Sequence, residues 1–292
     1  MFSGSLVAIV TPMHADGGLD FSAWGRLIQF HIENGTSGIV VGGTTGESPS
    51  LSDDELVQLT QRACEQAQGR IQIITGAGSS GTAATVERVR RVSQLPVDGV
   101  LIVTPAYNRP TQEGLFRHYE AVAAASRVPV IAYNVPSRTA VDMLPATVAR
   151  IAQLPRMVAV KEAVAQVSRV REILERVPSS FAVLSGDDAS ACEVVLAGAR
   201  GVISVTANVA PGAMAAMIAA AVQGDAAGAR TLDAGIAALH ETLFLETNPI
   251  PAKWALARMG LIGPGLRLPL TELAEPFRAQ LERALRQSGA LR

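Results

Sequence analysis

The sequence predicts an α/β fold: a closed (β/α)8 or TIM barrel with appended C-terminal helices. Two observations predict it. Short runs rich in Val and Ile recur eight times, at intervals of about 25 to 35 residues, and each is followed by a polar or glycine cluster and a segment of helical periodicity. The runs are continuously apolar rather than alternating, as in parallel strands covered on both faces. Eight β-then-α units in succession favour a closed barrel over an open doubly wound sheet.

The expected strands end where polar residues begin. In chain order they are SLVAIVTP near residue 7, SGIVVGGTT near 40, IQIITGAG near 73, GVLIVTP near 101, VPVIAYNVP near 131, MVAVKEA near 159, FAVLSGDD near 183 and GVISVTAN near 203. Helical segments lie between them. One of these, SLSDDELVQLTQRACEQA, places Ser52 three residues before Glu55, which is the spacing of a capping box.

The chain after the eighth strand contains helical patterns and no further strand. The first of these patterns, PGAMAAMIAAAVQGD, completes the eighth unit. We therefore expect a catalytic barrel over residues 1–224 and a helical extension over residues 225–292. No linker rich in Pro and Ser separates the two, so the extension is expected to pack on the barrel or on a neighbouring subunit.

Composition narrows the possible partners and location. The 292 residues are 48% hydrophobic and 17% charged, with a formal net charge of −1, so nothing favours binding to nucleic acid or to an anionic membrane. The N-terminus lacks the basic region of a signal peptide, and no apolar run of about 18 residues predicts a membrane span. Cys64 and Cys192 lie far apart in helical segments and are expected to be free thiols. A cytoplasmic location is the expectation.

Candidate functional residues lie where the predicted strands end, because loops at the carboxyl ends of barrel strands build the site. These strand ends supply several hydroxyl groups and one amine, that of Lys161. Two roles are open for this amine. Most lysines pack their stems and keep a solvated ammonium. A Schiff-base lysine must instead be neutral, and lowering its pKa from near 10.4 by about 3 units costs about 4 kcal/mol, which burial can supply.

Two further observations bear on Lys161. Glu162 follows it directly, but alternation along a strand turns Glu162 to the opposite face, so it is a poor ion-pair partner. The chain contains only two lysines, and its other 23 Lys or Arg residues are arginines. Because arginine cannot form an imine, a lysine kept in such a chain favours the Schiff-base role. This second argument is weak, because the other lysine, Lys253, is expected on a C-terminal helix with no site around it.

Other strand ends offer supporting groups. Tyr133 ends the fifth strand and is either a core residue or, with Thr44 and a second tyrosine, part of a proton relay. Arg138 in YNVPSRT is suited to two-point binding of a carboxylate. The loop GGTTGES lacks the spacing of a phosphate-binding loop and fits a small carboxylate or carbonyl better.

Metal binding is not predicted. The adjacent acids of SGDDAS have no nearby histidine or further acid, so helix capping by Asp187 or Asp188 is the preferred role. The four histidines have no metal-ligand spacing; they are His14, His31, His118 and His240.

Together these segments give the chain a resemblance to a known family. The motifs GGTTGES, VTPAYNRPTQEGL, YNVPSRT, VAVKEA, LSGDDAS, GVISVTANVAP and NPIPAKWAL occur in this order. The chain resembles the dihydrodipicolinate synthase family of pyruvate-dependent class I aldolases, from SLVAIVTPM to the C-terminal helices. As a set the motifs are highly specific.

The resemblance implies an activity and a role for each site residue. The activity is condensation of pyruvate with L-aspartate 4-semialdehyde to 4-hydroxy-tetrahydrodipicolinate, the first committed step of diaminopimelate and lysine biosynthesis, in a homotetramer without a cofactor. Lys161 would form the imine with pyruvate. Tyr133, Thr44 and Tyr107 would make the proton relay, with Tyr107 reaching in from the adjoining subunit of a tight dimer. The remaining implied residues are Thr45 and the backbone of Ile203, which hold pyruvate, Gly186 in the wall of the site, and Arg138, which binds the carboxylate of the second substrate.

Departures from the family pattern give two further expectations. Relatives inhibited by lysine have polar residues around an effector pocket, whereas this chain has Ala106, Leu56, Ser80 and Ala84 at the matching positions, which predicts weak or absent feedback. The usual KEATG is KEAVA here, so Val164 and Ala165 remove a hydroxyl expected near the site. Two alternatives therefore stay open: another 2-keto acid aldolase of the N-acetylneuraminate lyase type, or a non-catalytic barrel that binds a keto acid. The SRT segment favours the synthase.

Overall fold

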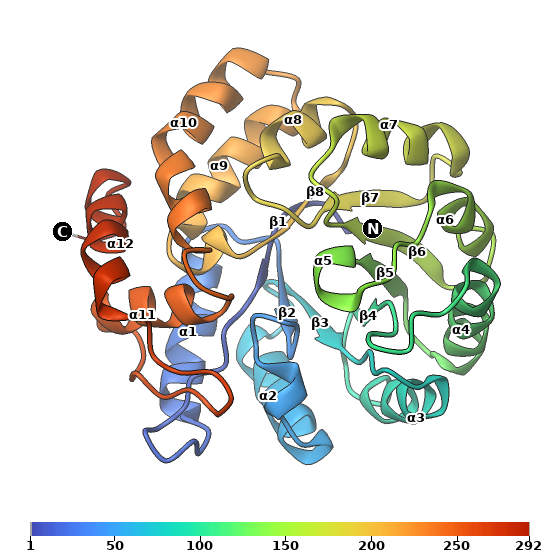
Figure 1. The fold of residues 1–292 in the computed structure, drawn as a ribbon, viewed down its shortest axis with the longest axis horizontal. Coiled ribbons are helices and arrows are strands. Elements are labelled where there is room, and N and C mark those ends of the chain that lie inside the picture. Colours follow the sequence, from blue (N-terminus) through green and yellow to red (C-terminus); the bar gives the residue numbers. More distant parts are fainter. Residues whose placement is uncertain (1, 292) are drawn as a thin grey trace.

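Eight parallel strands form a closed barrel surrounded by helices (Figure 1) in the computed structural model, which describes residues 2–291. The strands follow one another around the barrel in sequence order, and the last pairs with the first through Gly4–Gly201 to Val7–Ser204. All eight predicted strands are confirmed. They are β1 Gly4–Ala8, β2 Gly38–Val41, β3 Gln72–Gly76, β4 Gly99–Val103, β5 Val130–Asn134, β6 Met157–Glu162, β7 Ala182–Ser185 and β8 Gly201–Ser204.

Helices cover the outside of the barrel. Those between strands are α1 Phe21–Glu33, α2 Asp53–Ala67, α3 Thr82–Val92, α4 Gln112–Ala125, α5 Pro136–Thr139, α6 Pro145–Ile151, α7 Val167–Arg176 and α8 Ala191–Leu196. After β8 come α9 Pro211–Val222, α10 Ala226–Thr242, α11 Ile250–Arg258 and α12 Glu275–Gln287, and two short 3-10 turns lie at η1 Ser48–Ser50 and η2 Thr206–Asn208. None of the helices in the described residues is long and apolar enough to cross a membrane.

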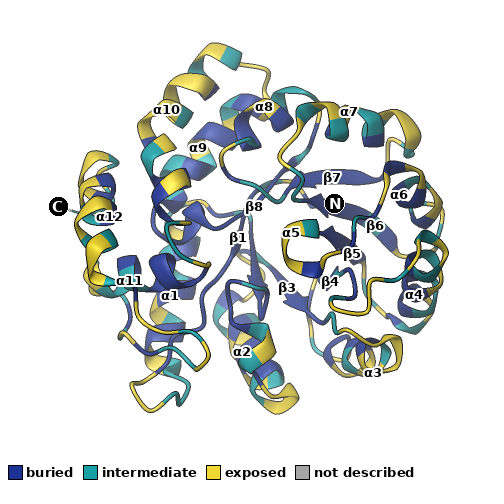
Figure 2. Cartoon of the chain, in the orientation of Figure 1, coloured by how far each residue is buried: buried dark blue, intermediate teal, exposed yellow. Residues whose placement is uncertain are grey.

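The strands are buried on both faces, which explains their continuous apolar runs (Figure 2). Side chains that point inward form a small cluster inside the barrel, including Leu6, Val40, Ile74 and Ile131. Side chains that point outward join the inner faces of the helices in a larger core. The helices are buried toward the barrel and exposed on the other side, so one amphipathic layer encloses the sheet.

Local sequence signals fix the helix starts. Ser52 Oγ accepts the N–H of Glu55 at 3.2 Å, and Glu55 Oε2 accepts the N–H of Ser52 at 2.9 Å, which confirms the predicted capping box at α2. Thr111 caps α4 by a single bond, in which its hydroxyl oxygen accepts the N–H of Gly114 at 3.2 Å.

The helices that follow α9 pack along the barrel. In Figure 1, α10 runs beside α9, and α11 and α12 lie outside α1. The boundary expected after residue 224 falls in the turn between α9 and α10. The segment between α10 and α11 turns back over the carboxyl ends of the strands, which brings part of the extension to the candidate site.

Candidate active site

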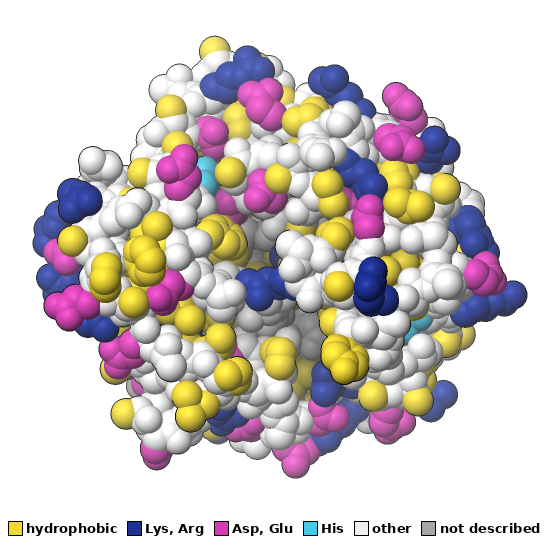
Figure 3. All heavy atoms as spheres, in the orientation of Figure 1, with side chains coloured by type: hydrophobic (Ala, Val, Ile, Leu, Met, Phe, Trp, Pro, Cys, Tyr) yellow, Lys and Arg dark blue, Asp and Glu magenta, His cyan; other side chains and the backbone are white. Residues whose placement is uncertain are grey.

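A cavity of about 120 Å³ opens at the carboxyl ends of the strands. Figure 3 shows this face hollowed near its centre, with basic side chains at the edge of the hollow. Residues from most of the strand ends, and from the extension, line the cavity: Ala8, Gly43, Thr44, Thr45, Leu101, Tyr133, Val135, Ser137, Arg138, Lys161, Ala163, Gly186, Asp187, Val205, Phe244 and Asn248. Six of the eight predicted site residues are among them, and the other two, Tyr107 and Ile203, are not.

Lys161 is the amine of this cavity. It lies near the end of β6 and is 5% exposed. Its Nζ lies 4.3 Å from the centre of the Tyr133 ring, because Tyr133 and Lys161 are directly paired on neighbouring strands. Burial lowers the pKa of Lys161 to about 8; Asp188 opposes the shift and Arg138 adds to it. At pH 7 about a tenth of such amines is neutral, against well under a thousandth of free lysine side chains.

The carboxylate of Asp188 favours the protonated form of Lys161 and so raises its pKa, against the effect of burial. Its Oδ2 accepts the N–H groups of Val205 at 2.9 Å and of Thr206 at 2.8 Å, which holds the turn after β8. Its Oδ1 is buried and has no hydrogen-bond partner among the described residues. Helix capping is the role predicted for Asp187 or Asp188, but the N-cap of α8 is Ser190 and no side chain in the described part of the chain caps this helix. Asp187 Oδ2 accepts the N–H of Ser190 itself at 2.9 Å. The predicted capping role is therefore wrong for both acids: Asp187 bonds to the residue before α8, and Asp188 bonds to the segment after β8.

Tyr133 and Thr44 meet across the cavity. Burial raises the pKa of the Tyr133 phenol, while the charge of Arg138 and a hydrogen bond with the Thr44 side chain act in the opposite direction. Tyr133 therefore stays protonated at neutral pH and can exchange its proton with groups beside it. Thr44 belongs to the loop after β2, where Gly42 has a φ of 62° that favours glycine.

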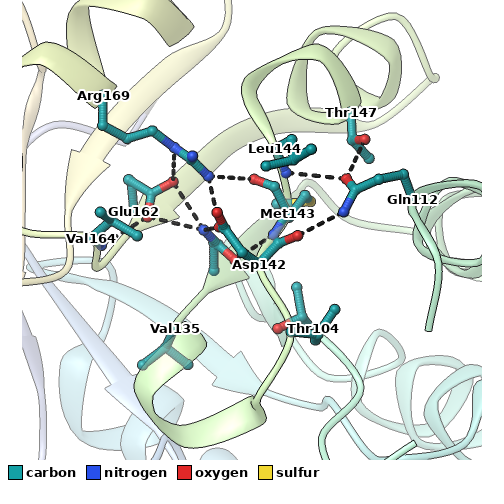
Figure 4. A network of polar contacts seen from close by, with 12 residues as sticks. Thr104, Gln112, Val135, Asp142, Met143, Leu144, Thr147, Glu162, Val164 and Arg169 are labelled. Atoms are coloured by element: carbon teal, nitrogen blue, oxygen red, sulfur yellow. Dashed lines mark hydrogen bonds and ion pairs between the residues drawn. The ribbon is translucent and has the colours of Figure 1, made fainter. Parts of the chain in front are cut away.

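Glu162 points away from the cavity, as strand alternation predicts. Figure 4 shows it in a network outside the barrel, where Arg169 lies 3.5 Å from Glu162 and 2.7 Å from Asp142. Asn134 Nδ2 donates to both oxygens of Glu162 at 3.1 Å. This network ties β5 and β6 to the segment that follows α5. Glu162 is thereby engaged and does not pair with Lys161.

The two residues expected to recognise carboxylates lie on the cavity wall. Arg138, on the short helix α5, donates from Nη2 to the backbone oxygen of Asn248 at 3.2 Å. The hydroxyl of Thr45 accepts a hydrogen bond from Asn248 Nδ2 at 2.9 Å. Asn248 was quoted in the motif NPIPAKWAL but was assigned no role. Its contact with Thr45 could not be predicted from local sequence, because the two residues are 203 positions apart.

Lys253 corrects a second expectation. It is fully buried in α11, and its Nζ lies 2.5 Å from Glu47 Oε1. Glu47 belongs to the loop GGTTGES, whose Gly43, Thr44 and Thr45 line the cavity, so Lys253 does have part of the candidate site beside it. The sequence prediction failed because a contact between residues 206 positions apart leaves no local signal.

Gly186 and Ile203 differ in their relation to the cavity. Gly186 forms part of the wall, and a Cβ added there would lie 2.9 Å from Cβ of Ala163 and 3.0 Å from Cε of Lys161, so a side chain at this position would crowd both residues. Ile203 is buried inside the barrel and is not among the lining residues, whereas Val205 is. Val164 and Ala165 do not line the cavity either; Val164 donates its N–H to Glu162 outside the barrel at 2.8 Å. A hydroxyl at position 164, where relatives have threonine, would therefore not line the cavity.

Tyr107 lies away from the cavity of its own chain. Its side chain is 92% exposed, and its backbone has a φ of 70°, which is uncommon outside glycine. It is not among the residues that line the cavity.

A second cavity, of about 310 Å³, includes two of the four positions that match the effector pocket of lysine-inhibited relatives. Ser80 and Ala106 line it together with Ser48, Pro49, Leu51, Gly78, Ser79, Arg88 and Val103. Leu56 is buried next to Gly42, and Ala84 is exposed. Arg88 is already paired with Asp53 at 2.7 Å, and no acidic side chain lines the cavity among the described residues.

Neither the cysteines nor the histidines form a second site. Cys64 and Cys192 are free thiols whose pKa values burial raises to about 11. No cluster of His, Cys, Asp and Glu within residues 2–291 could hold a metal ion. His31 and His118 are buried against threonine hydroxyls at 3.0 Å, and burial lowers their pKa values to about 3 and about 4.

A buried lysine of lowered pKa at the end of a barrel strand, beside a tyrosine phenol, defines a class of protein: the (β/α)8 barrels of class I aldolase type. Comparison with known proteins identifies the family. The chain belongs to the dihydrodipicolinate synthetase family, whose model matches residues 1–288.

Individual relatives agree over the whole chain. The chain is 52% identical over 291 residues to the 4-hydroxy-tetrahydrodipicolinate synthase of Methylococcus capsulatus, covering 100% of both chains. It superimposes with a TM-score of 0.98 and 47% identity on the chloride-inhibited dihydrodipicolinate synthase of Acinetobacter baumannii complexed with pyruvate, again over 100% of both chains. The enzyme of Cyanidioschyzon merolae with lysine bound gives a TM-score of 0.96 at 34% identity, over 99% of both chains.

Proposed function

We propose that the protein condenses pyruvate with L-aspartate 4-semialdehyde to 4-hydroxy-tetrahydrodipicolinate, the first committed step of diaminopimelate and lysine biosynthesis. The observation that carries the proposal is the buried Lys161 amine, with a pKa lowered to about 8, beside Tyr133 in a cavity of about 120 Å³. Membership of the dihydrodipicolinate synthetase family supports the choice of substrates. The cavity is of a size for small keto acids.

The reaction proceeds through a covalent intermediate. The neutral Nζ of Lys161 attacks the C2 carbonyl of pyruvate, and the carbonyl oxygen leaves as water, which gives an imine. Loss of a methyl proton converts the imine to an enamine. The enamine carbon attacks the aldehyde carbon of aspartate 4-semialdehyde and forms the new C–C bond. The amino group of the same substrate then replaces Lys161 at C2, so that cyclisation releases the free lysine and the product.

Tyr133, Thr44 and Tyr107 move the protons of these steps. The contact between Tyr133 and Thr44 and the position of the Tyr133 ring against Nζ support this role. Tyr107 completes the relay from the adjoining subunit, which its exposure in the single chain allows. The enzyme therefore works as a dimer at least, and as a homotetramer of two such dimers, in the cytoplasm and without a resident cofactor.

The substrates bind through hydroxyl, backbone and guanidinium groups. Thr45 and the backbone of Ile203 hold the carboxylate of pyruvate, against the wall at Gly186. Arg138 binds the carboxylate of aspartate 4-semialdehyde in two-point fashion, because its planar fork of donors matches the two oxygens. Lining of the cavity by Thr45, Gly186 and Arg138 supports these assignments. Neither nucleic acid nor a membrane is a partner.

Reductive trapping tests the proposal. Incubation with pyruvate and borohydride, followed by peptide mass mapping, should add a reduced pyruvate adduct to Lys161 and leave Lys253 unmodified. Lys253 is a built-in control because it is equally buried but paired. Absence of an adduct on Lys161 would favour a barrel that merely binds a keto acid. Turnover of N-acetylneuraminate without turnover of aspartate 4-semialdehyde would favour the lyase alternative.

A further inference from the structure

The loop that carries Thr44 and Thr45 is held by a buried charge at its end. Glu47 has a φ of 58°, a left-handed conformation that costs a residue with a side chain roughly 1 kcal/mol. Its N–H donates to the backbone oxygen of Thr44 at 3.1 Å, and the oxygen of Gly46 accepts from the Thr11 hydroxyl at 2.7 Å. The position of Glu47 therefore sets the position of the two threonines.

The partners of Glu47 come from the C-terminal extension. Lys253 Nζ lies 2.5 Å from Oε1, and both side chains are fully buried. The backbone N–H of Arg267 donates to Oε2 at 3.2 Å. A buried carboxylate requires such partners, because an unpaired charge away from water is strongly destabilising. Both oxygens of Glu47 are thus satisfied by one segment of the chain, residues 248–267.

The same segment contacts the cavity at two more points. Asn248 donates to the Thr45 hydroxyl at 2.9 Å, and its backbone oxygen accepts from Arg138 at 3.2 Å. Arg267 also reaches Glu55 at the start of α2, at 2.5 Å. Residues 248–267 therefore contact the loop after β2 at Thr45 and Glu47, and the loop after β5 at Arg138.

We propose that the Lys253–Glu47 ion pair and Asn248 are positioning residues through which the C-terminal extension holds Thr44 and Thr45 in place for reaction with pyruvate. This inference rests on the proposed function, because it takes Thr44 and Thr45 to be the groups that meet pyruvate. Lys253 itself does not line the cavity and reaches it through Glu47. The extension is then part of the active site and not only a cover for the barrel.

The test compares Lys253→Met, Glu47→Gln and the double variant. Each single change leaves one buried charge unpaired, whereas the double variant leaves none and should recover most of the lost stability to urea. Positioning predicts that the double variant still shows at least a tenfold loss of kcat/KM for pyruvate, because the loop is no longer drawn toward α11. Lys253→Arg keeps a positive charge beside Glu47, so its kcat/KM for pyruvate should lie between those of the double variant and the wild type. Asn248→Ala should raise the KM for pyruvate with little change in stability.

A core variant of the same extension is the matched control. Leu239→Ala in α10 removes a fully buried side chain far from the loop, so it should lower stability while the kcat and KM of the folded enzyme stay unchanged. Wild-type kinetics in the double variant, or losses that merely follow stability as in Leu239→Ala, would overturn the inference. Borohydride trapping on wild-type Lys161 is run alongside. Failure of that trapping sinks the proposed function, whereas successful trapping with unchanged variant kinetics sinks the positioning role alone.

Discussion

The chain contains two lysines, and both are buried, yet their surroundings make them different groups. Lys253 has a carboxylate at 2.5 Å and belongs to an ion pair. Lys161 has an aromatic ring at 4.3 Å and no ion pair among the described residues, and burial lowers its pKa to about 8. Burial lowers the pKa of Lys253 too, but Glu47 opposes that shift and engages the ammonium, so burial alone does not make a lysine available as a nucleophile. What makes the amine of Lys161 available is burial without an adjacent partner that holds its proton.

The largest effect is expected from removing the unpaired amine. Lys161→Met should lower kcat by about a thousandfold or more, because no imine can form. The fold should remain, since methionine fills a similar volume without a charge to bury. Steady-state kinetics and urea unfolding of the same preparation check both parts. A Lys161→Met variant that turns over at more than a tenth of the wild-type rate would contradict the comparison.

Removing the paired amine should act on stability first. Lys253→Met leaves Glu47 buried without its partner, so the free energy of unfolding should fall by about 3 to 5 kcal/mol. Arg230→Met, which breaks the exposed pair between α10 and Glu193 of α8, is the control and should hardly move the unfolding midpoint. If both substitutions lowered the free energy of unfolding equally, the buried Lys253–Glu47 pair would stabilise the protein no more than an exposed pair does.

A smaller effect is expected when the charge near Lys161 is changed. Asp188 favours the protonated amine and thus raises the pKa of Lys161, so Asp188→Asn should move this pKa below about 8. Imine formation needs the neutral amine, and the acid limb of the pH profile of kcat/KM for pyruvate should move to lower pH. The asparagine oxygen can still accept from Val205 and Thr206. Arg138→Met should move the limb to higher pH, and shifts of the opposite sign would refute the charge assignment.

The smallest effect concerns a third amine, free lysine. The second cavity offers an ammonium no carboxylate partner, since no acidic side chain lines it in the described part of the chain and Asp53 is paired with Arg88. We expect little or no inhibition at low-millimolar lysine in a coupled assay. Lysine should also leave the unfolding temperature unchanged. Inhibition at or below that concentration would mean that the cavity recruits partners from a second chain.

The fold and the centre of the site could be predicted from the sequence because their signals are local. Continuous Val and Ile runs identify the strands, and the position of Lys161 at a strand end places it in the cavity. Alternation along one strand correctly turned Glu162 outward. Asn248 and the partner of Lys253 could not be predicted in this way. Their contacts join residues more than 200 positions apart, and only the closed barrel brings those residues together.

The pairing of β5 with β6 has a consequence for folding fidelity. Tyr133 faces Lys161 inside the barrel, and the next pair, Asn134 and Glu162, faces outward, after one irregularity between Val130 and Ile131. A slip of one residue would exchange these pairs and put the Glu162 carboxylate in the keto-acid cavity and the amine among the helices. The outer network of Figure 4 can form in one alignment alone. The contacts of Glu162 outside the barrel therefore also fix the strand register that places Lys161 inside it.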